Sequence, residues 1–465
     1  MLAGMNSISE LVQIQKDYFN GGETLDIPFR KRQLKKLYRL IADSRDEIFD
    51  ALQADLNKPP FETYETEVGI VLEEIRYLTA HLSKWAKPRR VSVPLVLFPA
   101  KGTVYAQPYG RVLIMSPWNY PFQLAIAPLA AALAAGNCAV LKPSNYSNAT
   151  SKLIQKLIRS AFPEKYVAVV EGGREANTDL LKQQFDYIFF TGGTAVGKLV
   201  MESAARFLTP ITLELGGKSP CIVDQSADID VAARRIVWGK YLNAGQTCIC
   251  PDYVLAHTSI KQALIERMQY WIVRHYGTDA LTHPDYAKII SVRHFERLTA
   301  LCDGSNPANG TVVFGGARDA ASRKIAPVIL DAPAADSPVM TDEIFGPILP
   351  VLEFSDLEHV RRFVVDRPRP LALYFFSSSK KNISFIVSRI PYGGGCINDT
   401  IMHVASSKMP FGGIGNSGMG RYHGKAGFDT FSHTKSVLTR GTFPDVSVRY
   451  PPYGSKLPLL QKLLK

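Results

Sequence analysis

The sequence predicts an α/β fold with a parallel sheet, and three observations support this. Short apolar runs alternate with helical segments between residues 107 and 216, which is typical of βαβ units whose sheet is covered on both faces. A second α/β pattern begins after about residue 220. The chain has 465 residues, of which 46% are hydrophobic. Single cores stop growing near roughly 250–300 residues, so we expect two or three domains.

The segment before the alternation is predicted to be helical up to about residue 85, with few glycines and a stop at "KWAKPRRVSVP". Within it, "RKRQLKKLYRLI" (30–41) places Leu34, Leu37, Tyr38 and Ile41 at i, i+3, i+4 and i+7, so a surface helix with basic residues opposite an apolar face is expected. The stretch 91–106 is rich in β-branched residues and proline around a Lys-Gly turn. It predicts a hairpin or an extended arm.

The alternation itself defines the expected strands and helices. Strands are predicted at "RVLIM" (111–115), "AVLKP" (139–143), "VAVVEG" (167–172), "YIFFTGG" (187–193) and "ITLELGG" (211–217), with helices from about 122, from 147, through "REANTDLLKQQ" and from 194. Further strands are predicted at "PCIVD", "YVLAH", "TVVFGG" and "LALYFFS", and a last β-prone segment at "TFSHTKSVLTRG".

Polar residues at the carboxyl ends of the predicted strands are the candidates for chemistry, because ligands of parallel sheets bind there. Asn119 is either an amide donor for an oxyanion or a turn asparagine. Lys142 either reaches a ribose or phosphate or lies at the surface. The turn "FFTGGTAVGK" (189–198) either cradles a pyrophosphate or is an ordinary βα turn. Glu214 is either a general base or a salt-bridged glutamate.

Charge and cysteine content narrow the class of protein. The net charge of +12 and the pI near 9.3 suit anionic partners or describe a solvated basic surface. The sequence has neither interleaved aromatic and basic residues nor the Cys and His spacing of a zinc site, so it gives no support for binding to nucleic acid. Six scattered cysteines indicate free thiols in a reducing compartment. We see no signal peptide, and the apolar stretch 124–136 is too short to span a membrane, so a cytoplasmic protein is expected.

The sequence "GQTCIC" holds two cysteines, Cys248 and Cys250, and raises the question of a metal site, a disulfide or a nucleophile. A metal site is not expected, because no Cys or His lies within the loop and His257 falls in an apparent strand. A disulfide between the two would close a strained short ring. A nucleophilic thiol and a buried structural thiol remain as alternatives.

No single motif above identifies the class of protein, but the set of motifs and their order along the chain do. "PWNYP", "KPS", "FTGGT", "ELGGKSP", "GQTC", "EIFGP" and "PFGGIGNSG" follow one another along the chain. Together they resemble the aldehyde dehydrogenase superfamily from about residue 10 to 450. The short N-terminus, "GNSGMGRYHGKAGFDTFSH" and "RYPPY" are most similar to its class 3 branch, which includes fatty and aromatic aldehyde dehydrogenases.

The resemblance implies roles for individual residues. Cys248 would attack the aldehyde, Asn119 and the Cys248 backbone N–H would hold the oxyanion, and Glu214 would activate the water that hydrolyses the thioester. Residues implied to bind NAD or NADP are Lys142, Ser144, Asn145, Gly192, Gly193, Thr194, Gly197, Leu215, Glu343 and Phe345. Residues expected to line the aldehyde tunnel are Tyr120, Thr247, Ile401, Met402 and His403. Cys250 matches no family role.

The chain departs from many relatives at Asn145, where a glutamate commonly follows "KPS". That glutamate would bind the ribose hydroxyls and repel a 2′-phosphate, so its absence predicts tolerance of NADP beside NAD.

The family fold implies three parts and a tail. These are a Rossmann-type cofactor domain (1–86 and 107–216), an α/β catalytic domain (217–428), a β oligomerisation arm (87–106 and 429–450) and a tail (451–465). Class 3 relatives imply a homodimer. The tail clusters Leu460, Leu463 and Leu464 opposite Lys462 and Lys465. We expect it to pack near the tunnel mouth or on the partner, with weak membrane-surface binding as the alternative.

The same motifs can be weighed against three rival functions. A CoA-acylating dehydrogenase would keep the fold, but Glu214 favours hydrolysis. A non-catalytic binding protein on the same scaffold would be expected to lack Cys248 or Glu214, and both are present. A cysteine hydrolase would need a histidine base that the motifs do not supply. The leading prediction is therefore oxidation of a medium- or long-chain aliphatic or aromatic aldehyde to its acid.

Overall fold

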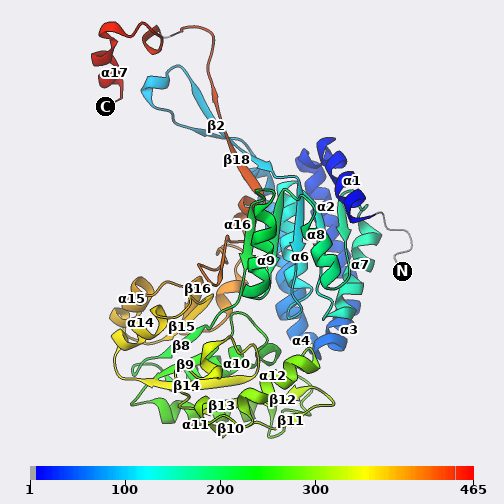
Figure 1. The fold of residues 1–465 in the computed structure, drawn as a ribbon, viewed down its shortest axis with the longest axis vertical. Coiled ribbons are helices and arrows are strands. Elements are labelled where there is room, and N and C mark those ends of the chain that lie inside the picture. The colour runs from blue at the N-terminus through cyan, green and yellow to red at the C-terminus, as the bar shows by residue number, and fades with distance from the viewer. Residues whose placement is uncertain (1–6, 446, 465) are drawn as a thin grey trace.

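The structure is a computed structural model, and it describes residues 7–445 and 447–464. Residues 1–6, at the start of the predicted cofactor domain, lie outside the described part, as do Lys465 and the side chain of Leu463 in the predicted tail cluster. Figure 1 shows two α/β bodies and an arm that extends away from them.

The N-terminal segment is helical, as predicted. It forms α1 (Ile8–Asn20), α2 (Ile27–Asp43), α3 (Arg45–Leu56), α4 (Pro60–Thr63) and α5 (Gly69–Trp85). Asp26 caps α2 by accepting the N–H of Phe29, which satisfies one of the free donors at the helix start. Leu34, Leu37 and Ile41 are buried, whereas Tyr38 is exposed. The apolar face of α2 is thus narrower than its spacing predicted.

The first sheet contains every strand predicted between 107 and 216. It consists of β3 (Arg111–Met115), β4 (Cys138–Lys142), β5 (Val167–Val169), β6 (Tyr187–Thr191) and β7 (Ile211–Glu214), with the short β17 (Gly418–Met419) at its edge. The order is β17-β7-β6-β3-β4-β5, and all pairs are parallel except β17 with β7. Because β4 and β6 flank β3, the strand order reverses there, and a crevice opens beyond the carboxyl ends of the strands.

Helices cover this sheet and explain its apolar runs. They are α6 (Gln123–Ala135), α7 (Asn148–Ala161), α8 (Arg174–Leu181) and α9 (Thr194–Ala205). Every residue of α6 is buried, which accounts for the apolar stretch at 124–136. The helix ends at Gly136 with φ +99, where a side chain would meet the Arg30 guanidinium; only glycine combines that backbone conformation with that contact.

The second sheet has seven strands in the order β10-β13-β14-β9-β8-β15-β16. They are β8 (Pro220–Val223), β9 (Tyr253–His257), β10 (Thr311–Phe314), β13 (Val328–Asp331), β14 (Ile348–Phe354), β15 (Ala372–Phe376) and β16 (Gly394–Ile397). All pairs are parallel except β10 with β13. Its helices are α10 (Ile229–Tyr241), α11 (Lys261–Tyr276), α12 (Val292–Cys302), α14 (Leu357–Val365) and α15 (Lys380–Arg389).

One segment from the second half of the chain returns to the first sheet. Gly418 of β17 pairs with Glu214 of β7, and α16 (Gly424–Thr430) packs on α5 and α6. This segment falls within the range predicted for the catalytic domain. The predicted domain boundaries remain a proposal. The pairing of β17 with β7 brings this segment beside Glu214, at the end of β7.

The arm is a three-stranded sheet in the order β1-β2-β18. The hairpin predicted near 91–106 is β1 (Arg89–Val91), η3 (Leu95–Leu97) and β2 (Lys101–Pro108), and β18 (Ser432–Thr439) pairs antiparallel with all of β2. The terminal helix α17 (Leu457–Leu463) contacts η3. It lies at the end of the arm, away from both α/β bodies (Figure 1), so within this chain the tail does not cover the mouth of a tunnel.

Among the described residues, no helix combines the length and apolar character that crossing a membrane requires.

Candidate functional site

A cavity of about 380 Å³ lies in the crevice of the first sheet. It brings together most of the predicted catalytic and cofactor residues: Asn119, Lys142, Ser144, Asn145, Gly192, Gly193, Glu214, Leu215, Cys248, Glu343 and Phe345. Thr194 and Gly197 belong to the first turn and a half of the adjoining α9 but do not line the cavity. Residues from both halves of the chain thus converge at the ends of β3, β4, β6 and β7.

The glycine turn forms one wall of this cavity. Gly193 is the N-cap of α9 and provides no side-chain cap. A Cβ placed on it would meet no atom within 4 Å. The first N–H groups of α9 are therefore open to an anion from the cavity side, in the arrangement that binds phosphates. Gly197 serves packing instead, because a Cβ there would lie 2.7 Å from the Leu215 side chain.

Lys142 ends β4 and is buried, with its Nζ donating to the Pro143 carbonyl at 2.8 Å. Burial lowers the pKa of Lys142 to about 8. Ser144 is partly buried and Asn145 exposed at the rim, where the Asn145 amide is close to Gly173. No carboxylate lines the cavity beside Asn145 in the described residues; the two that line it are Glu214 and Glu343.

The nucleophile candidate lies after a sharp backbone reversal. The helix α10 is followed by η4 (Leu242–Gly245), in which Asn243 and Ala244 have φ of 51° and 52°. Such left-handed conformations are costly for alanine and persist only where the surroundings hold them. The reversal brings Cys248, which is partly buried, to the cavity wall. Burial, followed by the nearby Glu343 and Glu214, raises the pKa of the Cys248 thiol.

Asn119 is buried in the loop after β3. Its side-chain Nδ2 donates to the Gln246 carbonyl at 3.0 Å. Its backbone carbonyl accepts from Lys58 Nζ at 3.2 Å and from Asn243 Nδ2 at 2.8 Å. The amide orientation is therefore defined, and one of its two N–H bonds is directed to the loop that carries Cys248.

Glu214, the last residue of β7, is buried with neither carboxylate oxygen hydrogen-bonded in the described part of the chain. Burial raises its pKa well above the usual range. A buried carboxyl without a partner is costly. Such a group in a cavity next to a thiol is a candidate for proton transfer.

Glu343 and Phe345 form the opposite wall. The Glu343 carboxylate packs so closely on Gly216 that a Cβ there would overlap it. Burial, then Asp252, raises the pKa of Glu343 to about 8. Phe345 adopts φ 51° and its ring contacts Trp118 edge-on, with the ring centres 5.3 Å apart.

A second, mostly apolar cavity of about 130 Å³ meets the first at Cys248. Tyr120, Thr247, Ile401 and Met402, which were predicted to line an aldehyde tunnel, line this cavity. Further lining residues were not anticipated, namely Ile70, Leu124, Trp238, Leu242, Val404, Phe411 and Tyr422. They come from separate helices and loops, so no local pattern in the sequence marks them.

His403 is the exception among the predicted substrate residues, because it does not line this cavity. Its Nδ1 lies 3.6 Å from Cys396 Sγ and its ring packs beside Phe411. Burial lowers the pKa of His403 to about 4. It lies behind the cavity wall because η6 (Met402–Ala405) turns successive side chains in different directions.

Cys250 is buried, and its thiol donates to the Gly245 carbonyl at 3.4 Å. Lys240 Nζ lies 3.9 Å from its sulfur. Both cysteines of "GQTCIC" are free thiols. In residues 7–445 and 447–464, no group of His, Cys, Asp and Glu has the arrangement of a metal site.

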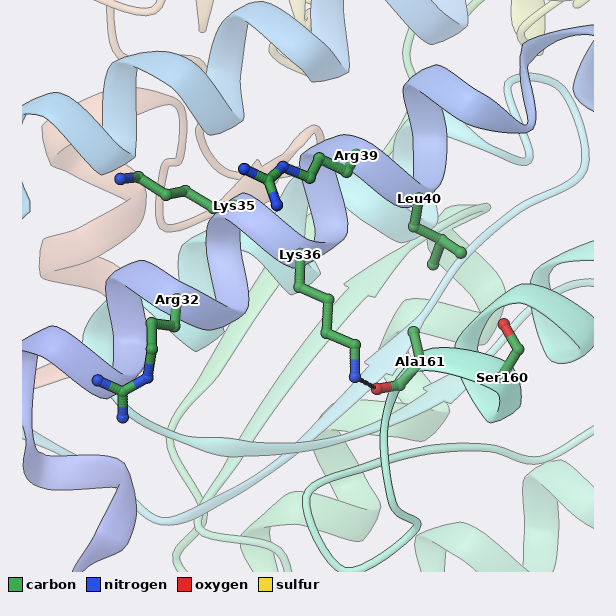
Figure 2. Close-up of a pocket in the computed structure, with 7 residues that line it drawn as sticks. All are labelled: Arg32, Lys35, Lys36, Arg39, Leu40, Ser160 and Ala161. Atoms are coloured by element: carbon green, nitrogen blue, oxygen red, sulfur yellow. Dashed lines mark hydrogen bonds between the residues drawn. The ribbon is translucent and has the colours of Figure 1, made fainter.

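The basic face of α2 lines a separate groove of about 530 Å³. Figure 2 shows Arg32, Lys35, Lys36 and Arg39 on α2, with Leu40 on the same helix and Ser160 and Ala161 at the end of α7. Lys36 donates to the Ala161 carbonyl, and all four basic residues are exposed. They form the solvated basic surface that the sequence suggested as one interpretation of its charge.

Comparisons with known proteins agree with this geometry. The model of the aldehyde dehydrogenase family matches residues 2–437. The 4,4'-diaponeurosporen-aldehyde dehydrogenase of Staphylococcus aureus is 45% identical over 99% of this chain and 100% of its own. The dimeric NADP-preferring aldehyde dehydrogenase of Canis lupus familiaris is 44% identical over 97% and 99%, respectively. Aldehyde dehydrogenase family 3 member A2 of Rattus norvegicus is 43% identical over 95% and 90%.

Solved structures give the same result. The substrate-bound state of Staphylococcus aureus AldH superposes with a TM-score of 0.96, at 45% identity, over 99% of this chain and 100% of that one. A putative aldehyde dehydrogenase from Burkholderia cenocepacia superposes with a TM-score of 0.84, at 26% identity, over 92% and 88%. The predicted α/β fold with a Rossmann-type sheet is confirmed.

Fold, cavities and relatives together define an oxidoreductase that acts on aldehydes with NAD or NADP. More narrowly, the chain belongs to the aldehyde dehydrogenase family and groups with its class 3 branch, as its motifs had indicated.

Proposed function

We propose that the protein oxidises medium- or long-chain aliphatic or aromatic aldehydes to carboxylic acids through a covalent intermediate on Cys248. The observation that carries the proposal is the position of Cys248, which lines both the polar cavity and the apolar one. A thiol at this junction can meet an aldehyde from one side and a dinucleotide from the other.

The polar cavity fits a nicotinamide dinucleotide. The uncapped start of α9 at Gly193 suits the pyrophosphate, and Lys142 and Ser144 border the cavity where a ribose would be held. Glu343 would hold the second ribose, with Phe345 beside the ring. When bound, the oxidised dinucleotide supplies the acceptor for the hydride.

In the first half of the reaction, the Cys248 sulfur bonds to the aldehyde carbon and its proton is transferred away. This proton passes to solvent water, so the first half does not require Glu214. The Asn119 amide and the Cys248 backbone N–H stabilise the negative oxygen of the thiohemiacetal. Loss of hydride from the same carbon leaves a thioester on Cys248.

In the second half, Glu214 takes a proton from a water molecule, and the resulting hydroxide adds to the thioester carbon. The carbon–sulfur bond then breaks, which releases the acid and restores the thiol. The raised pKa of Glu214 suits this step, because a carboxylate with a high pKa is a stronger base toward water.

The test is a panel of aldehydes, from short aliphatic to long-chain and aromatic, assayed by NADH and NADPH formation. The apolar lining at Trp238, Phe411 and Tyr422 supports a preference for the long and aromatic members. Product analysis with and without CoA separates hydrolysis from acylation of CoA. Absence of activity on every aldehyde, or an acyl-CoA as the only product, would contradict the proposal.

We propose that NADP is accepted beside NAD, since Asn145 presents no charge to a 2′-phosphate. Replacing Asn145 with Glu should raise KM for NADP by about tenfold or more, equal to at least about 1.4 kcal/mol, and leave KM for NAD little changed. Steady-state kinetics with both dinucleotides measure this. Activity with NAD alone in the unaltered protein would contradict it.

We also propose a cytoplasmic homodimer. The free state of all six cysteines supports a reducing compartment. The arm supports dimerisation, because β18 is an eight-residue edge strand whose residues are nearly all exposed and edge strands are commonly covered by another chain. The tail then packs on the partner, and flotation with liposomes, with and without residues 454–465, tests weak membrane binding instead.

A further inference from the structure

A fully buried ion pair lies behind the proposed oxyanion donor. Lys58 Nζ and Glu67 Oε1 are 2.6 Å apart, and both side chains are 0% exposed. Lys58 follows the end of α3, and Glu67 belongs to the π-helical turn η2 (Tyr64–Val68). Burying such a pair costs about as much desolvation energy as the attraction returns. The pair therefore adds little net stability, and its role lies in the backbone groups to which the two side chains are hydrogen-bonded.

The pair holds the middle and the carboxyl end of the loop that carries Asn119. Lys58 Nζ donates to the Asn119 backbone carbonyl at 3.2 Å. The second oxygen of Glu67 accepts the backbone N–H groups of Phe122 and Gln123 at 3.0 and 2.9 Å. The loop between β3 and α6 is therefore anchored by one buried cation and one buried anion.

The same carbonyl of Asn119 also connects this loop to the nucleophile loop. Asn243 Nδ2 donates to it at 2.8 Å, and the backbone N–H of Asn243 is held by Glu62 at 3.0 Å. The Asn119 side chain makes a second hydrogen bond between the two loops by donating to the carbonyl of Gln246, two residues before Cys248.

Tyr120 provides a parallel connection. Lys58 Nζ lies 3.8 Å from the centre of the Tyr120 ring. The Tyr120 hydroxyl is 2.6 Å from the Thr247 hydroxyl, next to Cys248 in sequence. Lys58 thus contacts both residues through which the Asn119 loop meets the nucleophile loop.

We propose that Lys58 is a positioning residue for the reaction at Cys248: it holds the Asn119 loop so that the amide donor and the thiol keep their relative placement. The inference rests on the proposed function. Lys58 is fully buried and lines neither cavity, so it would touch neither aldehyde nor dinucleotide. Its loss removes one of the two donors to the Asn119 carbonyl and leaves the Glu67 charge without its cation.

The test is the double variant Lys58→Met/Glu67→Gln, which removes both charges while keeping an acceptor for Phe122 and Gln123. The rate of the NADH burst should fall by about 10- to 100-fold, since misplacing a reacting group by an ångström costs on that order. KM for NAD should stay within about twofold. Alkylation of Cys248 by iodoacetamide, which needs no amide donor, should also stay within about twofold.

A matched control is Arg111→Met/Asp186→Asn. This pair, at the amino end of β3, is also largely buried on the arginine side, with the ions 2.9 Å apart, but it makes no contact with the Asn119 loop. We expect an unchanged burst rate in this control. Where the Lys58 double variant does not fold, Asn243→Gly removes the other donor to the Asn119 carbonyl without opposing the positive φ, and it should slow the burst in the same way.

A burst at the wild-type rate in folded Lys58→Met/Glu67→Gln or in Asn243→Gly would overturn the inference. So would a loss of alkylation rate in proportion to the burst, because that indicates a displaced loop in general. If the unaltered protein shows no burst with any aldehyde, the proposed function has failed instead, and the two failures are therefore distinguishable.

Discussion

At the scale of the residue, the two thiols of "GQTCIC" have separate environments. Cys248 opens on both cavities, while Cys250 is buried and donates to the Gly245 carbonyl. A single residue between them is enough for this difference, because successive side chains after the turn at Gly245 point to different surroundings.

We predict that Cys248→Ala abolishes NADH formation, whereas Cys250→Ala leaves kcat within about threefold. The first change removes the only thiol that lines the two cavities in the described residues. The second leaves a small gap in the core, which costs about 1 kcal/mol or more of stability. Steady-state rates and thermal unfolding of both variants measure this, and similar loss of activity in the two would contradict the assignment.

Glu214→Gln should leave a burst of NADH but slow steady-state turnover by about 100-fold or more, because water activation needs a carboxylate. The pKa of Glu214 is raised, so the group gains a proton as pH falls through that raised value. Turnover of the unaltered protein should therefore decrease toward low pH, and the variant should lose this pH dependence. Stopped-flow and pH–rate profiles test it; a variant without a burst would place Glu214 in the first half of the reaction.

At the scale of the element, the turn between β6 and α9 is the segment that we propose binds the dinucleotide. Gly193 has φ −73°, a conformation open to every residue. Backbone conformation therefore does not require a glycine at position 193. The glycine instead leaves the adjoining cavity free of a side chain. At Gly420, by contrast, φ is +87° and a Cβ would clash with Thr212.

Gly193→Val should fold normally and raise KM for NAD by about tenfold, or about 1.4 kcal/mol, because the added side chain enters the cavity. Gly420→Val should lower the melting temperature, since it opposes a left-handed backbone. Thermal unfolding together with NAD titration separates the two effects. A destabilised Gly193→Val with unchanged affinity would contradict this view of the turn.

At the scale of the whole molecule, the arm leaves apolar side chains in the open. Leu95, Phe98, Phe443 and Leu457 are each at least 60% exposed, and they come from the hairpin and from the segment after β18. A monomer rarely exposes so many large apolar groups together, so we propose that a second copy of the chain covers them.

We predict a dimer by light scattering at micromolar concentration. Leu438→Glu, on the exposed edge strand β18, should shift the mass toward that of the monomer because it buries a charge in the pairing surface. Leu208→Glu is the matched control, since Leu208 is 90% exposed and lies outside the arm. A monomer in the unaltered protein, or dissociation in the control, would contradict the prediction.

Much of the fold could be predicted because local pattern and global fold agree. Strands such as β3 and β6, covered on both faces, are continuous apolar runs, and α6 is apolar throughout. The strands β13, β14, β16 and β17 were not predicted. β13 is short and β14 contains a proline, while β16 and β17 contain glycine and pair because neighbouring strands hold them. Tyr38 was misplaced because periodicity does not give the width of the buried face.

The sequence by itself determined the family, the polar residues that end the strands of the first sheet, and the candidate roles of Cys248, Asn119 and Glu214. It could do so because each motif is a short continuous stretch of the chain. Only the tertiary structure decided which side chains share a cavity. It placed Cys248 between two cavities, excluded His403 from the apolar one, and joined Lys58 to Asn119 across sixty-one positions of sequence. Such contacts depend on how sheets and helices pack, and packing between distant segments leaves no periodic trace in the chain.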